Sequence, residues 1–149
     1  MNNLLSNNRG SVGRWIVIIV VAAAAFFGYQ YFKKTPRYAL IQFKKSVMFS
    51  NAEGTREFID LDKVAARLPE SYTNKEPDEK VKKRLVGELD SPTEKSIFKP
   101  VKNWSVLIVP IAVSENQMSA TVIPIEGTKI TLEKTTQDQW IITALDISE

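Results

Sequence analysis

Residues 15–32 of the chain read W-I-V-I-I-V-V-A-A-A-A-F-F-G-Y-Q-Y-F. These eighteen residues carry no charge, and Gln30 is their only strongly polar side chain. As a helix they would extend over about 27 Å, which is close to the ~30 Å hydrocarbon core of a bilayer. Aromatic residues that suit a membrane interface lie near both ends of the stretch. We therefore predict a membrane-spanning helix over residues 15–32.

Two other interpretations of this stretch stay open from the sequence. A cleaved signal peptide also has a basic front, and the small residues Ala22–Ala25 would suit a cleavage site. Cleavage is disfavoured because aromatic residues prolong the apolar run as far as Phe32, where a polar boundary is expected. A helix buried in a soluble core is the third interpretation. Residues 1–14, rich in Asn and Ser, are expected to form a disordered tail before a signal-anchor.

The composition lacks the side chains that most often perform acid–base and thiol chemistry. The chain contains no Cys and no His. Disulfides, thiolate nucleophiles and cysteine-ligated metals are therefore excluded, as are the commonest general base and transition-metal ligand. Asp60 and Asp62 form a close carboxylate pair, but helix capping explains them without chemistry. We predict a non-catalytic protein without a cofactor or metal; an enzyme with a carboxylate or Tyr site is the alternative.

Basic residues gather directly after the apolar stretch. Residues 33–102 carry 16 basic and 11 acidic side chains, whereas residues 103–149 carry 2 and 6. Because each Lys or Arg near an anionic membrane contributes about 1 kcal/mol, the cluster indicates contact with anionic lipid headgroups. A solvated helix face is the alternative, and a nucleic-acid partner is not expected because no sustained basic stripe is present. The membrane-proximal basic residues are Lys33, Lys34, Arg37, Lys44 and Lys45.

Three amphipathic segments predict helices between residues 35 and 90. Thr35 suits the N-cap of the first, and Pro36 suits its first helical position. Apolar residues then recur every three or four positions, as on one face of a helix. Asp60 is expected to cap the second helix, and the third is predicted over residues 78–89.

From residue 103 onward β-branched residues dominate and turns recur about every ten residues, which predicts an antiparallel meander. Pro110 indicates that the first strand is an edge or contains a bulge. The fold class is therefore α+β: a transmembrane helix, then about three helices packed on a four-stranded antiparallel sheet, with residues 33–149 forming one soluble domain. The predicted strands are Trp104–Val113, Met118–Ile125, Lys129–Lys134 and Gln139–Ile147.

Three aromatic residues of this domain have two possible roles. Phe43 lies on the apolar face of the first amphipathic helix, and Trp104 and Trp140 lie in the first and last predicted strands. We predict that they are core residues. The alternative is that they line a ligand cavity.

Two patterns resemble known families. Residues 38–46, Y-A-L-I-Q-F-K-K-S, and residues 58–61, F-I-D-L, resemble an uncharacterised family of small bacterial single-pass envelope proteins. Residues 130–132 with 139–142 are similar to the last hairpin of nuclear-transport-factor-two-like domains, which have a cystatin-like α+β fold. The resemblance implies a cone-like domain that faces the periplasm or the cell exterior. It implies no catalytic residue, because enzymes of that superfamily use Asp/His pairs and this chain contains no His.

The charge pattern and the resemblance disagree about membrane orientation. Arg9 and Arg14 precede the predicted span and five basic residues follow it, so the positive-inside rule favours a cytoplasmic domain. The resemblance favours the opposite side, and we expect an extracytoplasmic domain anchored in a bacterial inner or plasma membrane. Its expected function is binding, with the lipid bilayer and an envelope protein or small ligand as partners. A cytoplasm-facing membrane adaptor is the alternative.

Overall fold

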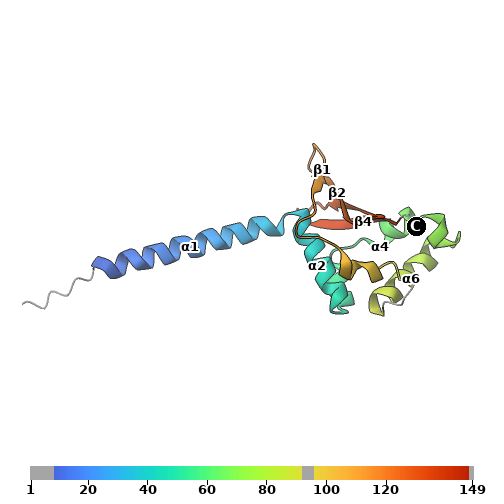
Figure 1. The fold of residues 1–149 in the computed structure, drawn as a ribbon, viewed down its shortest axis with the longest axis horizontal. Coiled ribbons are helices and arrows are strands. Elements are labelled where there is room, and N and C mark those ends of the chain that lie inside the picture. Colours follow the sequence, from blue (N-terminus) through green and yellow to red (C-terminus); the bar gives the residue numbers. More distant parts are fainter. Residues whose placement is uncertain (1–8, 92–95, 148–149) are drawn as a thin grey trace, which may run out of the picture. The chain divides into compact units, whose positions relative to one another are not determined.

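The computed structural model of the chain describes residues 9–91 and 96–147, drawn in Figure 1. The chain divides into two units: an apolar N-terminal helix within Met1–Lys33, and a compact domain over Lys34–Glu149. The domain contains helices packed on a four-stranded antiparallel sheet. The predicted α+β fold class is confirmed.

Helix α1 (Arg9–Lys33) begins earlier than the sequence predicts. Residues 9–14, expected in the disordered tail, are helical, whereas residues 1–8 of that tail lie outside the described residues. A helix that has nucleated in an apolar run gains one hydrogen bond for each added residue, which favours this extension. From Val12 to Lys33 all side chains are exposed, so this helix is not part of a soluble core. By length and composition it meets the requirement for a membrane span, which an N-terminal signal sequence also meets.

Three helices of the domain form where the amphipathic segments predict them. They are α2 (Pro36–Met48), α4 (Leu61–Arg67) and α6 (Asp78–Asp90). Three shorter elements lie outside the three amphipathic segments. These are α3 (Ala52–Arg56), α5 (Glu70–Thr73) and the 3-10 helix η1 (Lys99–Asn103).

Thr35 and Asp60 cap the N-termini of α2 and α4, as the sequence predicts. The hydroxyl oxygen of Thr35 accepts a hydrogen bond from the backbone N–H of Tyr38 at 3.3 Å. The carboxylate of Asp60 accepts one from the N–H of Lys63 at 3.1 Å. Each bond satisfies a donor that the first turn of a helix leaves without an intrahelical partner. The Asp60 carboxylate therefore acts as a helix cap.

The sheet is an antiparallel meander in the order β1-β2-β3-β4. Its strands are β1 (Ile111–Val113), β2 (Ser119–Ile125), β3 (Thr128–Lys134) and β4 (Trp140–Ile147). The outer edge of β4 is bridged at Ile142 by the segment that precedes α4. The N–H of Ile142 donates to the carbonyl of Phe58, and the carbonyl of Ile142 accepts from the N–H of Asp60, both at 2.8 Å. The other edge of the sheet is β1, which is only three residues long.

The helices of the domain lie on one face of the sheet (Figure 1), and the core fills the space between these two layers. Strands β2 and β3 alternate buried with more exposed positions, as expected for a sheet with one covered face, whereas β4 is buried at every position of 142–145. The largest fully buried side chains come from both layers, and include Phe43, Leu40 and Leu85 from the helices and Ile130, Leu132 and Ile142 from the sheet.

The first predicted strand, Trp104–Val113, is wrong over most of its length. Residues 104–110 are irregular and the ladder with β2 covers only Ile111–Val113, apart from one bond of 2.9 Å from the N–H of Ser105 to the carbonyl of Pro124. Pro110 has no N–H to donate to a ladder. Several carbonyl groups of the segment accept hydrogen bonds from side chains of α2 instead of from a neighbouring strand. This irregular segment forms one wall of a groove beside α2.

Candidate binding groove

A groove of about 560 Å³ lies between the second half of α2 and residues 104–108. We call it the α2 groove. One wall comes from α2 and the residue that follows it, and the other comes from the segment after η1. The residues that line it are Ile41, Lys44, Lys45, Met48, Phe49, Trp104, Ser105, Val106, Leu107 and Ile108.

Four large apolar side chains at the α2 groove are exposed. The exposed fractions are 56% for Met48, 73% for Phe49, 70% for Leu107 and 86% for Ile108. Single exposed apolar residues are common on protein surfaces, but several gathered in one place are typical of an interaction site. The α2 groove is therefore our candidate binding site.

Two basic side chains of α2 hold the segment that carries Leu107 and Ile108. The guanidinium of Arg37 donates hydrogen bonds to the carbonyls of Val106 and Val109, each at 2.9 Å, and to that of Leu107. The ammonium of Lys44 donates to the carbonyl of Trp104 at 2.8 Å. Hydrogen bonds from a charged donor are stronger than neutral ones, so these bonds fix the backbone while the two apolar side chains stay exposed.

The five predicted membrane-proximal basic residues have different surroundings. Lys33 belongs to α1, where its ammonium lies 4.8 Å from the centroid of the Tyr29 ring. Lys34 forms an ion pair of 2.9 Å with Asp138 in the turn between β3 and β4. Only Lys44 and Lys45 line the α2 groove.

The three predicted core or cavity aromatics all belong to the buried core. The ring of Phe43 stacks on that of Trp104, with centroids 5.8 Å apart. The indole N–H of Trp140 donates to the carbonyl of Lys34 at 3.0 Å, which ties the start of the domain to β4. Trp104 also lines the α2 groove, and its buried indole N–H has no acceptor among the described residues.

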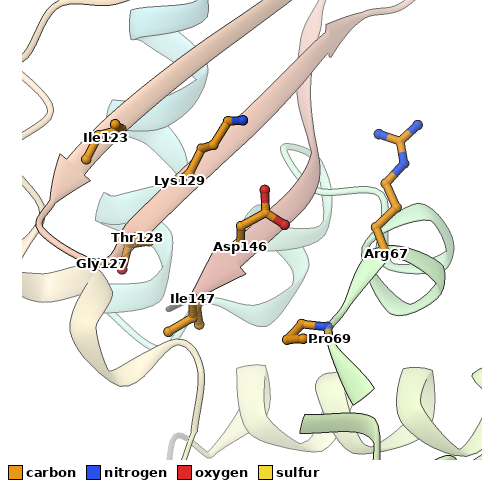
Figure 2. A pocket seen from close by; sticks show the side chains of 8 residues that line it. All are labelled: Arg67, Pro69, Ile123, Gly127, Thr128, Lys129, Asp146 and Ile147. Carbon is orange, nitrogen blue, oxygen red and sulfur yellow. The ribbon is translucent and has the colours of Figure 1, made fainter. Parts of the chain in front are cut away.

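A second, smaller hollow of about 420 Å³ lies at the ends of β3 and β4 (Figure 2). Figure 2 shows Lys129 and Asp146 projecting from these adjacent strands, and Arg67 projecting from the end of α4. The Arg67 guanidinium is already bonded to the Glu133 carboxylate at 2.9 Å and to the Thr143 hydroxyl at 3.1 Å. Because these bonds already engage the Arg67 guanidinium, we place the candidate binding site in the α2 groove and not in this hollow.

One Tyr–carboxylate pair matches the enzyme alternative in composition. The Tyr72 hydroxyl donates to the Glu88 carboxylate at 2.5 Å, and the same carboxylate accepts the N–H of Ile97 at 3.1 Å. Burial and this bond to Glu88 raise the pKa of Tyr72 above its usual value. The phenol therefore stays protonated near neutral pH. Across residues 9–91 and 96–147, no group of three or more carboxylates could hold a metal ion.

The chain matches no protein-family model, no curated protein and no solved structure. No family is identified by these comparisons. What the structure establishes of the suggested resemblance is an N-terminal apolar helix followed by an α+β domain with a four-stranded antiparallel sheet.

Replacing Arg37 by Met should release the wall of the α2 groove. The variant loses three charged hydrogen bonds and leaves partly buried carbonyls without these donors, so we expect about 1–3 kcal/mol less stability. Urea unfolding of the detergent-solubilised chain measures this loss, and amide exchange should accelerate at residues 106–109. Lys45→Met is the matched control, because Lys45 is exposed and takes no part in these bonds. Equal stability of the two variants would contradict a structural role for Arg37.

The turn between β3 and β4 contributes a pH-dependent term to stability. Hydrogen bonds from Lys134 and Lys34 lower the pKa of Asp138 from 3.8 to about 2. A carboxyl whose pKa is lower in the folded state stabilises the fold above its unfolded pKa, and loses this contribution as pH falls through the folded pKa. The stability difference between the unmodified chain and Asp138→Asn should therefore be constant above pH ~4 and shrink towards pH ~2. NMR titration of the Asp138 carboxyl measures the pKa directly, and an ordinary value near 3.8 would refute the prediction.

Proposed function

We propose that this chain is a membrane-anchored, non-catalytic binding domain of a bacterial cell envelope, and that the α2 groove is its contact surface. The observation that carries the proposal is the gathering of four exposed apolar side chains at the α2 groove, two of them on a segment held by Arg37 and Lys44. Exposing such residues has no benefit for the fold itself. Their fixed display is therefore best explained by a partner that covers them.

The anchoring part of the proposal is supported by α1. The 22 residues of Val12–Lys33 form a continuous apolar helix with exposed side chains. At about 1.5 Å per residue such a helix is about 33 Å long, enough to cross the hydrocarbon core. Retention of this helix as an anchor, instead of its cleavage as a signal peptide, is favoured by the aromatic residues that continue past Ala25.

The non-catalytic part of the proposal is supported by the side chains of the α2 groove. Their titratable groups are the ammonium groups of Lys44 and Lys45, and the groove residues include no carboxylate. An acid–base mechanism needs a group that changes protonation near the working pH, close to the reacting atoms. The Tyr72–Glu88 pair lies outside the α2 groove, and burial and the bond to Glu88 move the pKa of Tyr72 further from neutral pH.

Site-specific photocrosslinking in intact cells tests the binding role. A benzophenone amino acid at position 108 should give discrete adducts with an envelope component, whether protein or lipid. The same probe at position 123 is the matched control, since Ile123 is also an exposed isoleucine but lies on β2 and does not line the α2 groove. No difference between the two positions would overturn the α2 groove as the contact surface.

Orientation is tested separately. We propose that the domain faces the outside of the cytoplasmic membrane, in line with the resemblance and against the count of basic residues. Protease added to spheroplasts should then digest residues 34–149. Full protection of the domain in spheroplasts, with digestion only after lysis, would assign it to the cytoplasm.

A further inference from the structure

The side chains at the α2 groove indicate what kind of partner fits it. Apart from Lys44, Lys45 and Ser105, every residue that lines the α2 groove has an apolar or aromatic side chain. The ammonium of Lys44 is already bonded to the carbonyl of Trp104. Protein interfaces and small-molecule sites normally have several polar groups that orient the partner. The α2 groove instead offers exposed apolar side chains beside positive charge.

This combination matches the interface of an anionic bilayer. Proteins that dock on membranes insert Phe, Leu and similar side chains at the boundary between headgroups and acyl chains, with Lys or Arg beside them. Lysine suits this position, because its methylene groups lie along apolar surface while its ammonium reaches the anionic headgroups. At the α2 groove, Phe49, Leu107 and Ile108 supply the apolar part, and Lys45 supplies an exposed charge.

The covalent connection makes the membrane a favoured partner. Helix α1 ends at Lys33 and α2 begins at Pro36, so only Lys34 and Thr35 lie between them. A connection this short keeps the start of α2 within about 10 Å of the end of α1. If α1 is embedded in lipid, the domain meets the bilayer at a high effective concentration, and weak contacts then suffice for docking.

We propose that the α2 groove docks on the anionic surface of the bilayer that holds its own anchor, with Phe49, Leu107 and Ile108 entering the interface. This inference rests on the anchoring part of the proposed function. It also requires α2 to lie along the membrane surface. If α2 followed the membrane normal instead, its 13 residues would hold Phe49 about 20 Å from its start, out of contact with lipid.

Fluorescence quenching in proteoliposomes tests the docking. The chain contains no cysteine, so Ile108→Cys and Phe49→Cys each provide one labelling site for an environment-sensitive fluorophore in the full-length protein. The vesicles contain phosphatidylcholine alone or mixed with phosphatidylglycerol, and nitroxide-labelled lipids serve as quenchers. Ile123→Cys is the control, because it places the same label at an exposed isoleucine outside the α2 groove.

We expect lipid quenching at positions 49 and 108 to exceed that at position 123, and to increase with phosphatidylglycerol. Adding Lys45→Glu to the Ile108→Cys protein should reduce the phosphatidylglycerol-dependent part by about half or more, because it reverses a charge at the headgroups. Equal quenching at positions 108 and 123, or no effect of phosphatidylglycerol and of Lys45→Glu, would overturn the proposal.

The outcomes separate this proposal from the broader one. Discrete protein adducts at position 108 without lipid quenching would refute the lipid partner and leave the binding role in place. The absence of both adducts and quenching, in a protein that remains in the membrane, would refute both. A protein that leaves the membrane would refute the anchor on which the docking rests.

Discussion

Replacing Phe43 by Ala should lower the free energy of unfolding of the domain by about 3–5 kcal/mol, the cost typical of removing a buried aromatic ring. Phe43 is fully buried, and its ring contacts those of Trp104 and Phe98 at centroid distances of 5.8 and 6.2 Å. Truncation leaves a cavity where α2 meets η1 and the segment that follows it. Because domains of this size are stable by only about 5–15 kcal/mol, much of the variant should be unfolded at elevated temperature.

Phe49→Ala is the matched control, since it removes the same atoms one residue beyond the same helix, at a position that is mostly exposed. Its effect on stability should stay within about 0.5 kcal/mol. Chemical denaturation of the full chain in detergent, followed by tryptophan fluorescence, measures both variants. A cost for Phe43→Ala as small as that for Phe49→Ala would show that the ring is not in the core.

Placing Arg at both Val20 and Ala24 should release the chain from the membrane. Both positions lie near the middle of Val12–Lys33, on the same side of the helix. One Arg at the centre of a span costs about 2.5–3.5 kcal/mol in insertion assays, so two should cost about 5–7 kcal/mol. Membrane flotation should then move the protein from the lipid fraction to the soluble or aggregated fraction.

Leu at the same two positions is the control for this change. It alters the same side chains and keeps the helix apolar, so the protein should still float with the membranes. If the double Arg variant also floats, lipid does not surround the middle of α1. The domain would then have to reach the membrane by another route.

Local patterns in the sequence were sufficient to predict the positions of most helices and strands. Capping residues at Thr35 and Asp60 and the periodic apolar residues after them located α2 and α4, because these signals act within one or two turns of a helix. Turn residues and alternating β-branched residues located β2, β3 and β4. The short helices α3 and α5 were missed, since elements of four or five residues leave almost no periodic pattern.

The α2 groove was not predictable, because its walls are set by contacts between distant residues. The apolar run from Trp104 to Val109 reads as a buried strand, and its irregular path depends on bonds from Arg37, about 70 positions earlier. The bonds made by Arg37 and Lys44 could not be predicted either, because their acceptors lie about 60–70 positions further along the chain. In the structure the polar groups of both side chains bond to carbonyls of the domain. Pro110, which disfavours a central strand, was the one local signal for the correct structure.

Membrane extraction combined with intact mass measurement tests the central claim most directly. The full-length protein is expressed in a bacterial host, and the membranes are washed with alkaline carbonate. We predict that the protein stays in the membrane pellet with a mass that includes residues 12–33. A protein released into the supernatant, or a mature chain that begins near Phe26, would contradict the account, because the domain would then have no anchor beside it.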